Sequence, residues 1–391
     1  MDTKALALAE KDYIIGERRR FHAHPELGTE EYETTKHIAE ELRRMGIDVR
    51  TFDDITGCVG TLRGGRPGKT VMLRADIDAL PIQEADLTKP YASRNPGVMH
   101  ACGHDCHTAM LLGAAKILAA HREEIPGTVK FIFQMAEEIG TESRHYVEKG
   151  CLDGVDAIYG MHVWIQLPTG TVNIEDGPRM ACSDRFTIRI HGKAAHGSQP
   201  HKGHDSILAA AAVVMALQSL VSRVNDPQNT FVLTTGMMNG GTRDNIVAAE
   251  TELVGTVRAF NKDFRRSVPE LIRKTAEKTA EAYGCTAECS YFFGPAPLIN
   301  GCHALNETAR NAARKILGEN ALAPMERQMG AEDFSVYLEK TPGLYAYLGC
   351  RNEAKGLVSP HHSVTFDVDE DALPAGAALY AQFALDFLAG K

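Results

Sequence analysis

Residues 100–107 read His-Ala-Cys-Gly-His-Asp-Cys-His, and this is the densest group of metal-binding side chains in the sequence. Three histidines, two thiols and one carboxylate stand within eight residues, and Gly103 allows a sharp turn among them. Imidazole, thiolate and carboxylate are the groups that bind zinc-like ions in proteins. Cys102 and His104 are two positions apart, so they can point to the same side of an extended segment. The stretch predicts part of a metal site that distant residues complete.

Apolar runs on both sides of this stretch predict an α/β domain. The expected strands are 48–52, 58–62, 70–74, 128–133 and 155–159, and the expected helices are 3–24, 30–46 and 108–120. Strands that alternate with helices favour a largely parallel sheet. Three of the strands run into polar residues at Asp76–Asp78, Glu137–Glu138 and His162. Ligands of open α/β sheets bind at the carboxyl ends of the strands, which is where these residues stand.

The pattern changes after residue 183. A strand, a helix, two strands, a helix and a strand follow in turn, which is the βαββαβ order of ferredoxin-like units; they are expected at 185–190, 206–224, 230–235, 252–258, 263–283 and 286–292. A glycine-rich connection is expected at 236–245, and Gly-Pro-Ala-Pro at 294–297 is typical of a linker. We therefore predict a discontinuous catalytic domain, 1–183 and 295–391, with an inserted domain at 184–294.

Composition limits the classes of function. A chain of 391 residues with 44% hydrophobic and 24% charged residues is typical of a globular protein with two domains. A net charge of −9 argues against nucleic acid and anionic membranes as main partners. Nine cysteines, an odd number without framework spacing, fit a reducing compartment. The sequence shows neither an export signal nor an apolar run of membrane-spanning length, so we expect a cytoplasmic protein.

More candidate ligands lie far from residues 100–107. Adjacent carboxylates at Glu137 and Glu138 point in different directions after a strand, so one can bind a metal ion while the other faces a water molecule. His162 and the pair at 361–362 add imidazoles. Each of these residues alone is compatible with an ordinary buried or solvated side chain. Together they exceed the ligands of one ion, which favours two ions that share a ligand.

Five runs, in this order, resemble the aminoacylase/carboxypeptidase family of dinuclear metallohydrolases: Arg74–Pro81, His100–His107, Gln134–Glu138, Gly160–His162 and Glu332–Phe334. They are most similar to the branch of hippurate hydrolases, bacterial N-acyl-amino-acid amidohydrolases and plant auxin-conjugate amidohydrolases. The resemblance spans essentially the whole chain. It implies an α/β, metallopeptidase-like catalytic domain with an inserted ferredoxin-like lid or dimerisation domain.

The resemblance also implies roles for individual residues. Two divalent ions, Zn or Mn and otherwise Co or Ni, would be bound by the ligand set Cys102, His104, Glu138, His162 and His362. Cys102 would bridge the two ions. Glu137 matches the general acid/base, and Asp78 matches a carboxylate that orients the ligands. Asp76 stands where distant branches of the family place a ligand histidine, and we expect the thiolate branch to do without it.

In the inserted domain, His196 matches a histidine that reaches the scissile carbonyl, often from the partner subunit. Asn245 and Arg258 match positions that bind the substrate amide and carboxylate. Arg258 ends an expected strand, where a guanidinium can hold a carboxylate through two hydrogen bonds. The family expectation is a homodimer formed through the inserted domain.

The sequence therefore predicts a metal-dependent amidohydrolase that cleaves the amide bond of N-acyl-L-amino acids. A metal-activated water would attack, with Glu137 as general base. A dipeptidase, a carboxypeptidase or an N-acetyl-diaminopimelate deacetylase remains an alternative on the same site. A thiol amidase with Cys102 as nucleophile and His104 or His107 as base is a rival mechanism. A non-catalytic protein that binds a metal or an acyl-amino acid is the alternative of another class.

Overall fold

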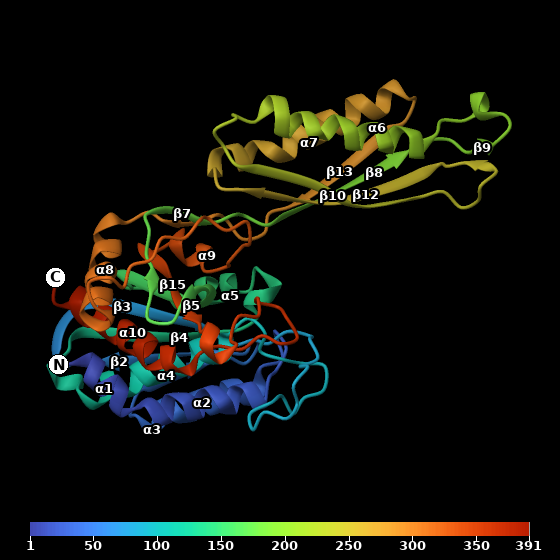
Figure 1. The fold of residues 1–391 in the computed structure, drawn as a ribbon. Coiled ribbons are helices and arrows are strands. Elements are labelled where there is room, and N and C mark those ends of the chain that lie inside the picture. Colours follow the sequence, from blue (N-terminus) through green and yellow to red (C-terminus); the bar gives the residue numbers. More distant parts are fainter. Residues whose placement is uncertain (391) are drawn as a thin grey trace. The chain divides into compact units, whose positions relative to one another are not determined.

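The computed structural model describes residues 1–390, and the chain divides into two compact units (Figure 1). The first unit contains residues 1–177, 299–326 and the chain from 333 onward, and the second contains 178–298 and 327–332. The second unit therefore includes the whole stretch expected as an inserted domain. The domain boundaries at 184 and 294 themselves stay a prediction.

The first unit alternates strands and helices along the chain. Its helices are α1 (Thr3–Ala9), α2 (Lys11–Ala23), α3 (Tyr32–Arg44), α4 (His104–Ala120), α5 (Ser143–Glu148), α8 (His303–Leu317), α9 (Ser335–Leu338) and α10 (Leu373–Leu388). Its strands are β1 (Asp48–Thr51), β2 (Cys58–Arg63), β3 (Arg66–Asp76), β4 (Pro126–Gln134), β5 (Ala157–Pro168), β6 (Val172–Asn173) and β15 (Gly343–Arg351). Short strands β7 (Gly177–Met180) and β14 (Leu298–Asn300) fall where the chain passes from one unit to the other.

These strands form one seven-stranded sheet in the order β1-β2-β4-β3-β5-β15-β6. Strands β4, β3, β5 and β15 are parallel, and the outer strands are antiparallel. The predicted α/β class is confirmed. Strand β4 pairs with one edge of β3, and the later strand β5 pairs with the opposite edge. Strand order reverses there, and in open α/β sheets ligands bind beyond the carboxyl ends of the strands at such a point.

Helix α4 begins beside the end of β3, where the Thr108 hydroxyl donates to the Asp76 carbonyl. Most of its residues are buried, as expected of a helix inside a core, and it packs against β3, α2 and α10 (Figure 1). Glycines permit this close packing: a Cβ at Gly113 would lie 2.7 Å from the Ile14 side chain, and one at Gly376 would lie 2.0 Å from Met110. The first residue of α4 is His104, so the core holds this candidate ligand at a fixed place.

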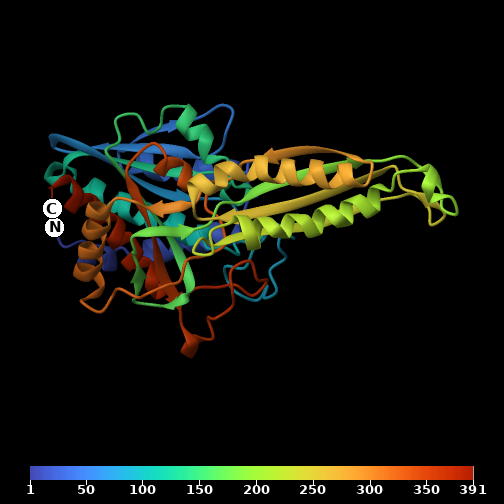
Figure 2. The ribbon, with the colours of Figure 1, turned by 90° about the horizontal axis from the view of Figure 1, so that it is seen from above.

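The second unit is a four-stranded antiparallel sheet with two helices. Its elements are β8 (Asp184–His191), β9 (Ala195–His196), α6 (Ser206–Ser219), a π-helical turn (Leu220–Val224), β10 (Phe231–Gly240), β11 (Ile246–Val247), β12 (Glu250–Ala259), α7 (Lys262–Ala282) and β13 (Thr286–Phe292). The strand order β10-β12-β8-β13 is that of a ferredoxin-like unit, as predicted. Helices α6 and α7 lie side by side (Figure 2).

One expectation from composition needs correction. The helical stretch Ser206–Val224 is long and apolar enough, by length and composition, to cross a membrane. In the structure its buried side chains, among them Ala209, Val213 and Leu217, join one core with the sheet of the second unit. The helix therefore belongs to a globular layer. Its outer face is nevertheless apolar, because Ile207, Leu208 and Met215 are exposed.

Several expected element boundaries were wrong. The helix expected at 3–24 is interrupted at Glu10 between α1 and α2. The strand expected to end at Tyr159 continues as β5 to Pro168, because a strand buried on both faces accepts His162 without ending. Helix α4 begins at His104 rather than near Thr108. Strand β10 continues through the first half of the expected glycine-rich connection, as far as Gly240.

Candidate metal centre

Gly103 sets the geometry of the two candidate ligands beside it. Its φ of +97° lies in the left-handed region, and a Cβ there would lie 2.4 Å from the Val163 side chain. Glycine alone fits this turn without strain. Cys102 and Gly103 lie in a bend, and His104 begins α4 directly after it.

Two groups of potential ligands overlap at Cys102. One consists of Cys102, His104 and His162, and the other of Cys102, Glu138 and His362. Within each group the ligand atoms lie within 4.8 Å of one another. Cys102 Sγ is 3.4 Å from His162 Nε2, and Glu138 Oε1 is 3.2 Å from His362 Nε2. Two sets of three donors that share one thiol match the chemistry of two adjacent cations with one bridging ligand.

The two buried histidines present the same ring nitrogen. His162 Nδ1 donates to the Val163 carbonyl, which leaves Nε2 with a free lone pair. His104 Nδ1 lies 2.9 Å from the Asp78 carbonyl oxygen and 3.0 Å from the Asp78 carboxylate. His104 Nε2 is buried without a hydrogen-bond partner among the described residues. Buried polar atoms are rarely left unsatisfied, so this nitrogen fits a metal ligand.

Asp78 holds two of the candidate ligands at once. One carboxylate oxygen accepts from the His104 ring, and the other accepts from the main-chain N–H of Glu138 at 3.0 Å. The side chain is buried at the end of β3. A carboxylate in this position fixes the ring orientation of the histidine and the turn that carries the glutamate.

The two glutamates differ in their surroundings. Strand β4 ends at Gln134, and Glu137 and Glu138 open a short 3-10 turn. Glu138 lies with Cys102 and His362. Glu137 stays outside the two groups that share Cys102, although one of its oxygens lies with His104 and Glu138. Its position next to the centre suits a base that acts on a water molecule there.

His362 rather than His361 faces Glu138. His361 donates from Nε2 to the Val163 carbonyl at 3.0 Å and packs against Trp164. His362 has a φ of +63°, which is uncommon for a residue with a side chain, and its N–H donates to the Ala101 carbonyl at 2.7 Å. Backbone strain of this kind, worth about 1–3 kcal/mol, gathers at functional sites.

Burial and charge set the protonation states of the metal-free centre. Burial, followed by the charges of Glu138 and Glu137, raises the pKa of the Cys102 thiol well above its usual value. Burial alone would lower the pKa of His104, but Asp76 and Asp78 outweigh it and raise this pKa to about 10. Burial lowers the pKa of His162. A thiol with a raised pKa is a poor nucleophile, so the centre does not favour the thiol-amidase mechanism.

Asp76 and His107 connect two strands next to the candidate ligands. The His107 Nδ1 donates to the Asp76 carboxylate, and His107 Nε2 accepts the Val163 N–H at 2.8 Å. Arg74 also donates to Asp76, at 2.6 Å. The pair thereby joins the end of β3 to the middle of β5, and His107 is engaged at both ring nitrogens.

The three remaining candidates belong to the second unit. His196 is exposed on β9, with Nδ1 2.7 Å from Ser198 Oγ, and the Asn245 carbonyl accepts the Gly197 N–H at 2.7 Å. These two residues therefore lie together. Strand β12 begins at Glu250, on the side of Asn245, and Arg258 lies near its other end. At about 3.3 Å per strand residue, Arg258 is roughly 25 Å from Glu250. Within one unit the structure does not bring Arg258 near His196 and Asn245.

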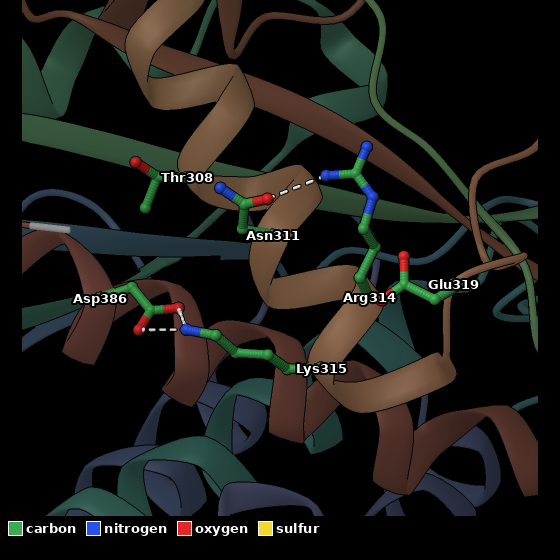
Figure 3. A pocket seen from close by; sticks show the side chains of 6 residues that line it. All are labelled: Thr308, Asn311, Arg314, Lys315, Glu319 and Asp386. Atoms are coloured by element: carbon green, nitrogen blue, oxygen red, sulfur yellow. Dashed lines mark hydrogen bonds and ion pairs between the residues drawn. The ribbon is translucent and has the colours of Figure 1, made fainter.

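A separate cavity of about 320 Å³ lies at α8 and α10 (Figure 3). Its lining contains an ion pair of Lys315 with Asp386 at 2.6 Å and a hydrogen bond from Arg314 to Asn311 at 2.8 Å. Both cations already have partners, and none of the candidate ligands lines the cavity. It offers no competing catalytic site.

The chain belongs to the peptidase family M20/M25/M40, whose profile matches residues 72–386. Thermostable carboxypeptidase 2 of Saccharolobus solfataricus is 40% identical over 381 residues, with 96% of each chain covered. The N-acyl-L-amino acid amidohydrolase of Geobacillus stearothermophilus is 41% identical over 336 residues, which cover 85% of this chain and 90% of that protein.

A solved structure, the Bacillus subtilis YXEP protein, described as a dinuclear metal binding peptidase of the M20 family, is 37% identical. It has a TM-score of 0.86 and covers 98% of this chain and 99% of its own. The family resemblance read from the sequence is confirmed. The protein is a metal-dependent amidohydrolase with a centre for two divalent ions.

Sequence reasoning assigned no structural role to some residues that organise the centre. Asp333 accepts from Gln134 Nε2 at 2.8 Å and from the Ser143 N–H at 3.0 Å, which ties the end of β4 to α5. The sequence offers His107 only as an alternative base to His104, whereas in the structure both of its ring nitrogens are engaged, by Asp76 and by the Val163 N–H. The run of polar residues at the end of β3 indicates such a network, but it does not identify the residues that take part in it.

Proposed function

We propose that this enzyme hydrolyses the amide bond of N-acyl-L-amino acids, as the amidohydrolase relative's name indicates for that protein. The observation that carries the proposal is the pair of ligand groups that share Cys102, with Glu137 adjacent. Metal ions at such a centre lower the pKa of a water molecule and polarise a carbonyl group. The two groups support the ligand set proposed from the sequence, because together they contain Cys102, His104, Glu138, His162 and His362.

The protein's own residues supply the proton transfers. Glu137 removes a proton from the attacking water and delivers it to the nitrogen of the departing amino acid. Asp78 keeps His104 and Glu138 in place while charge shifts in the centre. Glu137 must be unprotonated to act as the base in the first step. It gives the proton taken from water to the leaving nitrogen in the second step, so the residue is regenerated after each turnover.

The second unit would bind the substrate. His196 would donate to the carbonyl oxygen as negative charge develops on it, a contribution worth about 3–4 kcal/mol for one such donor in other hydrolases. Asn245 would bind the substrate amide, and Arg258 would hold the amino-acid carboxylate through two hydrogen bonds.

These roles support a homodimer. One small substrate cannot contact both ends of β12, so we propose that Arg258 and the pair His196 and Asn245 serve the sites of different subunits. The exposed apolar side chains of Leu208 and Met215 on α6, beside the unpaired edge of β10, offer a surface for the second copy. In this proposal the dimer is the active form.

The donor set guides the choice of metal, and the state of the cysteines guides the choice of compartment. Cys, His and Glu donors in one centre accept Zn or Mn, with Co and Ni as alternatives. All nine cysteines are free, which suits a reducing cytoplasm.

The proposal is tested with Glu137→Gln in the metal-loaded enzyme, assayed on a panel of N-acyl amino acids and dipeptides. We expect turnover to fall by at least about 100-fold, in the range of a lost general base, while two metal equivalents remain bound. Near-normal turnover of this variant would remove Glu137 from the mechanism. Preferential cleavage of dipeptides would favour the carboxypeptidase named among the relatives, and no cleavage of any panel member would favour a binding protein.

A second comparison separates the metal mechanism from the thiol-amidase rival. A chelator should abolish activity, and added Zn or Mn should restore it. Iodoacetamide should act slowly on the metal-loaded enzyme, because a thiolate engaged by metal is a poor nucleophile. Loss of activity on alkylation, with no effect of the chelator, would support Cys102 as nucleophile.

A further inference from the structure

The turn that carries Glu137 is held by side chains from three other segments. Ala136, directly before Glu137, has a φ of +52°, a left-handed conformation that costs a residue with a side chain free energy. The Met135 N–H donates to the Tyr146 hydroxyl at 3.0 Å, and the Ala136 N–H donates to Glu31 Oε1 at 2.8 Å. Such a turn persists only where its surroundings fix it.

Glu31 is the centre of this support. The residue is fully buried at the start of α3, and its second oxygen accepts the Thr56 hydroxyl. The Thr56 carbonyl in turn accepts the Tyr146 hydroxyl at 2.8 Å. Glu31, Thr56 and Tyr146 therefore form one connected network that holds two successive amides ahead of Glu137.

The chain before Glu31 is shaped to fit the turn. A Cβ at Gly28 would lie 3.0 Å from Ala136 Cβ, so glycine leaves the space that the turn fills. The Ala79 N–H donates to the Glu26 carbonyl at 2.8 Å, next to Asp78. The segment that delivers Glu31 is thus fixed against both strand ends that supply the centre.

Burial, as the largest cause, raises the pKa of Glu31 to about 7. The ionised carboxylate accepts from both donors. The protonated form still accepts the Ala136 N–H and can donate to the Thr56 hydroxyl oxygen. A neutral amide of the same shape can make the same two contacts, so the essential feature is an acceptor at this position rather than a charge.

We propose that Glu31 is a positioning residue for the hydrolysis: through the Ala136 amide it fixes the left-handed turn that aims Glu137 at the reacting water. The inference rests on the proposed role of Glu137 as general base. It assigns to a residue outside the metal centre an effect on turnover rather than on metal binding, because Asp78 independently holds the Glu138 amide.

Glu31→Gln, Glu31→Asp and Glu31→Ala test the inference, with the exposed neighbour Glu30→Gln as matched control and Glu137→Gln as reference. The glutamine keeps the acceptor in place, whereas aspartate keeps the charge but withdraws it by about 1.5 Å. We expect kcat of the glutamine variant within about threefold of the unaltered enzyme. In the aspartate and alanine variants we expect kcat to fall about 100-fold, the cost of a misplacement of about 1 Å, with KM and two metal equivalents retained.

The aspartate and glutamine pair keeps the test decisive if the alanine variant does not fold. A merely structural role would lower the melting temperature but leave kcat per metal-loaded molecule unchanged, and that result would overturn the inference. Equal losses in the glutamine and aspartate variants would also overturn it, because the acceptor is retained in one of them. If Glu137→Gln keeps normal turnover, the proposed function itself fails, whatever the Glu31 variants show.

Discussion

Replacing Asp78 with alanine should weaken metal binding without removing a metal ligand. The carboxylate accepts from His104 Nδ1 and from the Glu138 N–H, each at 3.0 Å. After the substitution His104 still donates to the main-chain carbonyl of residue 78, at 2.9 Å. The Glu138 N–H loses its acceptor in a partly buried site, and the turn that carries this ligand is no longer fixed from that side.

Two independent estimates give the magnitude. Loss of a group that orients a ligand costs about 10–100-fold in metal affinity. That range is about 1.4–2.7 kcal/mol, because each factor of ten is about 1.4 kcal/mol. A fully buried amide left without an acceptor costs about 1–3 kcal/mol, which sets an upper bound for the partly buried Glu138 amide in the same range. Since Asp78 serves two ligands, we expect the upper end, a loss of about 100-fold.

Competition of the metal-free protein with a chromophoric chelator for Zn measures this affinity. Asp78→Asn keeps one acceptor but sets an NH2 group against the second donor, so its loss should be intermediate, about 10-fold. Asp53→Ala removes an exposed carboxylate from the same unit and should leave the affinity unchanged. An unaltered metal affinity in folded Asp78→Ala would refute the assignment of Asp78 as the residue that orients the ligands.

Three other predictions concern stability, pH and assembly. Arg18→Met removes a fully buried cation that donates to Asp105 and Asp367 at 2.8 Å each, so the free energy of unfolding in urea should fall by about 3–5 kcal/mol. The free energy of unfolding of the metal-free protein should fall as pH rises from 6.5 to about 10. The folded state raises the pKa of His104, so protonation of this histidine stabilises the fold at low pH, and that stabilisation is lost as the proton leaves. A urea midpoint that rises over this interval would contradict the prediction. If the proposed homodimer forms through α6, Met215→Glu should give a monomer in light scattering and reduce turnover, and an active dimer of this variant would exclude this face as the interface.

The fold of both units could be predicted from local patterns. Strands of the second unit are apolar at alternate positions, as in Phe186, Ile188 and Ile190, so their period and order were readable. The boundary of β5 was not, because His162 is a polar residue inside a strand buried on both faces. Sequence alone cannot distinguish a polar residue that ends a strand from one that the interior accepts for ligand chemistry.

The donors of the centre were foreseeable, but the contacts that hold them were not. Carboxyl ends of parallel strands meet at one edge, so the convergence of residues near 76–78 and 137–138 follows from topology. His162 joins them from inside β5, because Gly160 of that strand pairs with Arg74 near the end of β3. The network of Glu31, Thr56 and Tyr146 joins segments up to 115 positions apart in the sequence. No spacing rule connects them, because their contact depends on how the turns at Gly28 and Ala136 pack.

The central claim is that one thiolate, Cys102, is shared by two metal ions. X-ray absorption at the Zn edge, on enzyme loaded with two Zn per chain, counts the sulfur ligands of the average ion at about 2.3 Å. A bridging thiolate gives each ion its own sulfur neighbour, so the account predicts about one sulfur per zinc. About half a sulfur per zinc, the value for a thiolate bound to only one of the two ions, would contradict it.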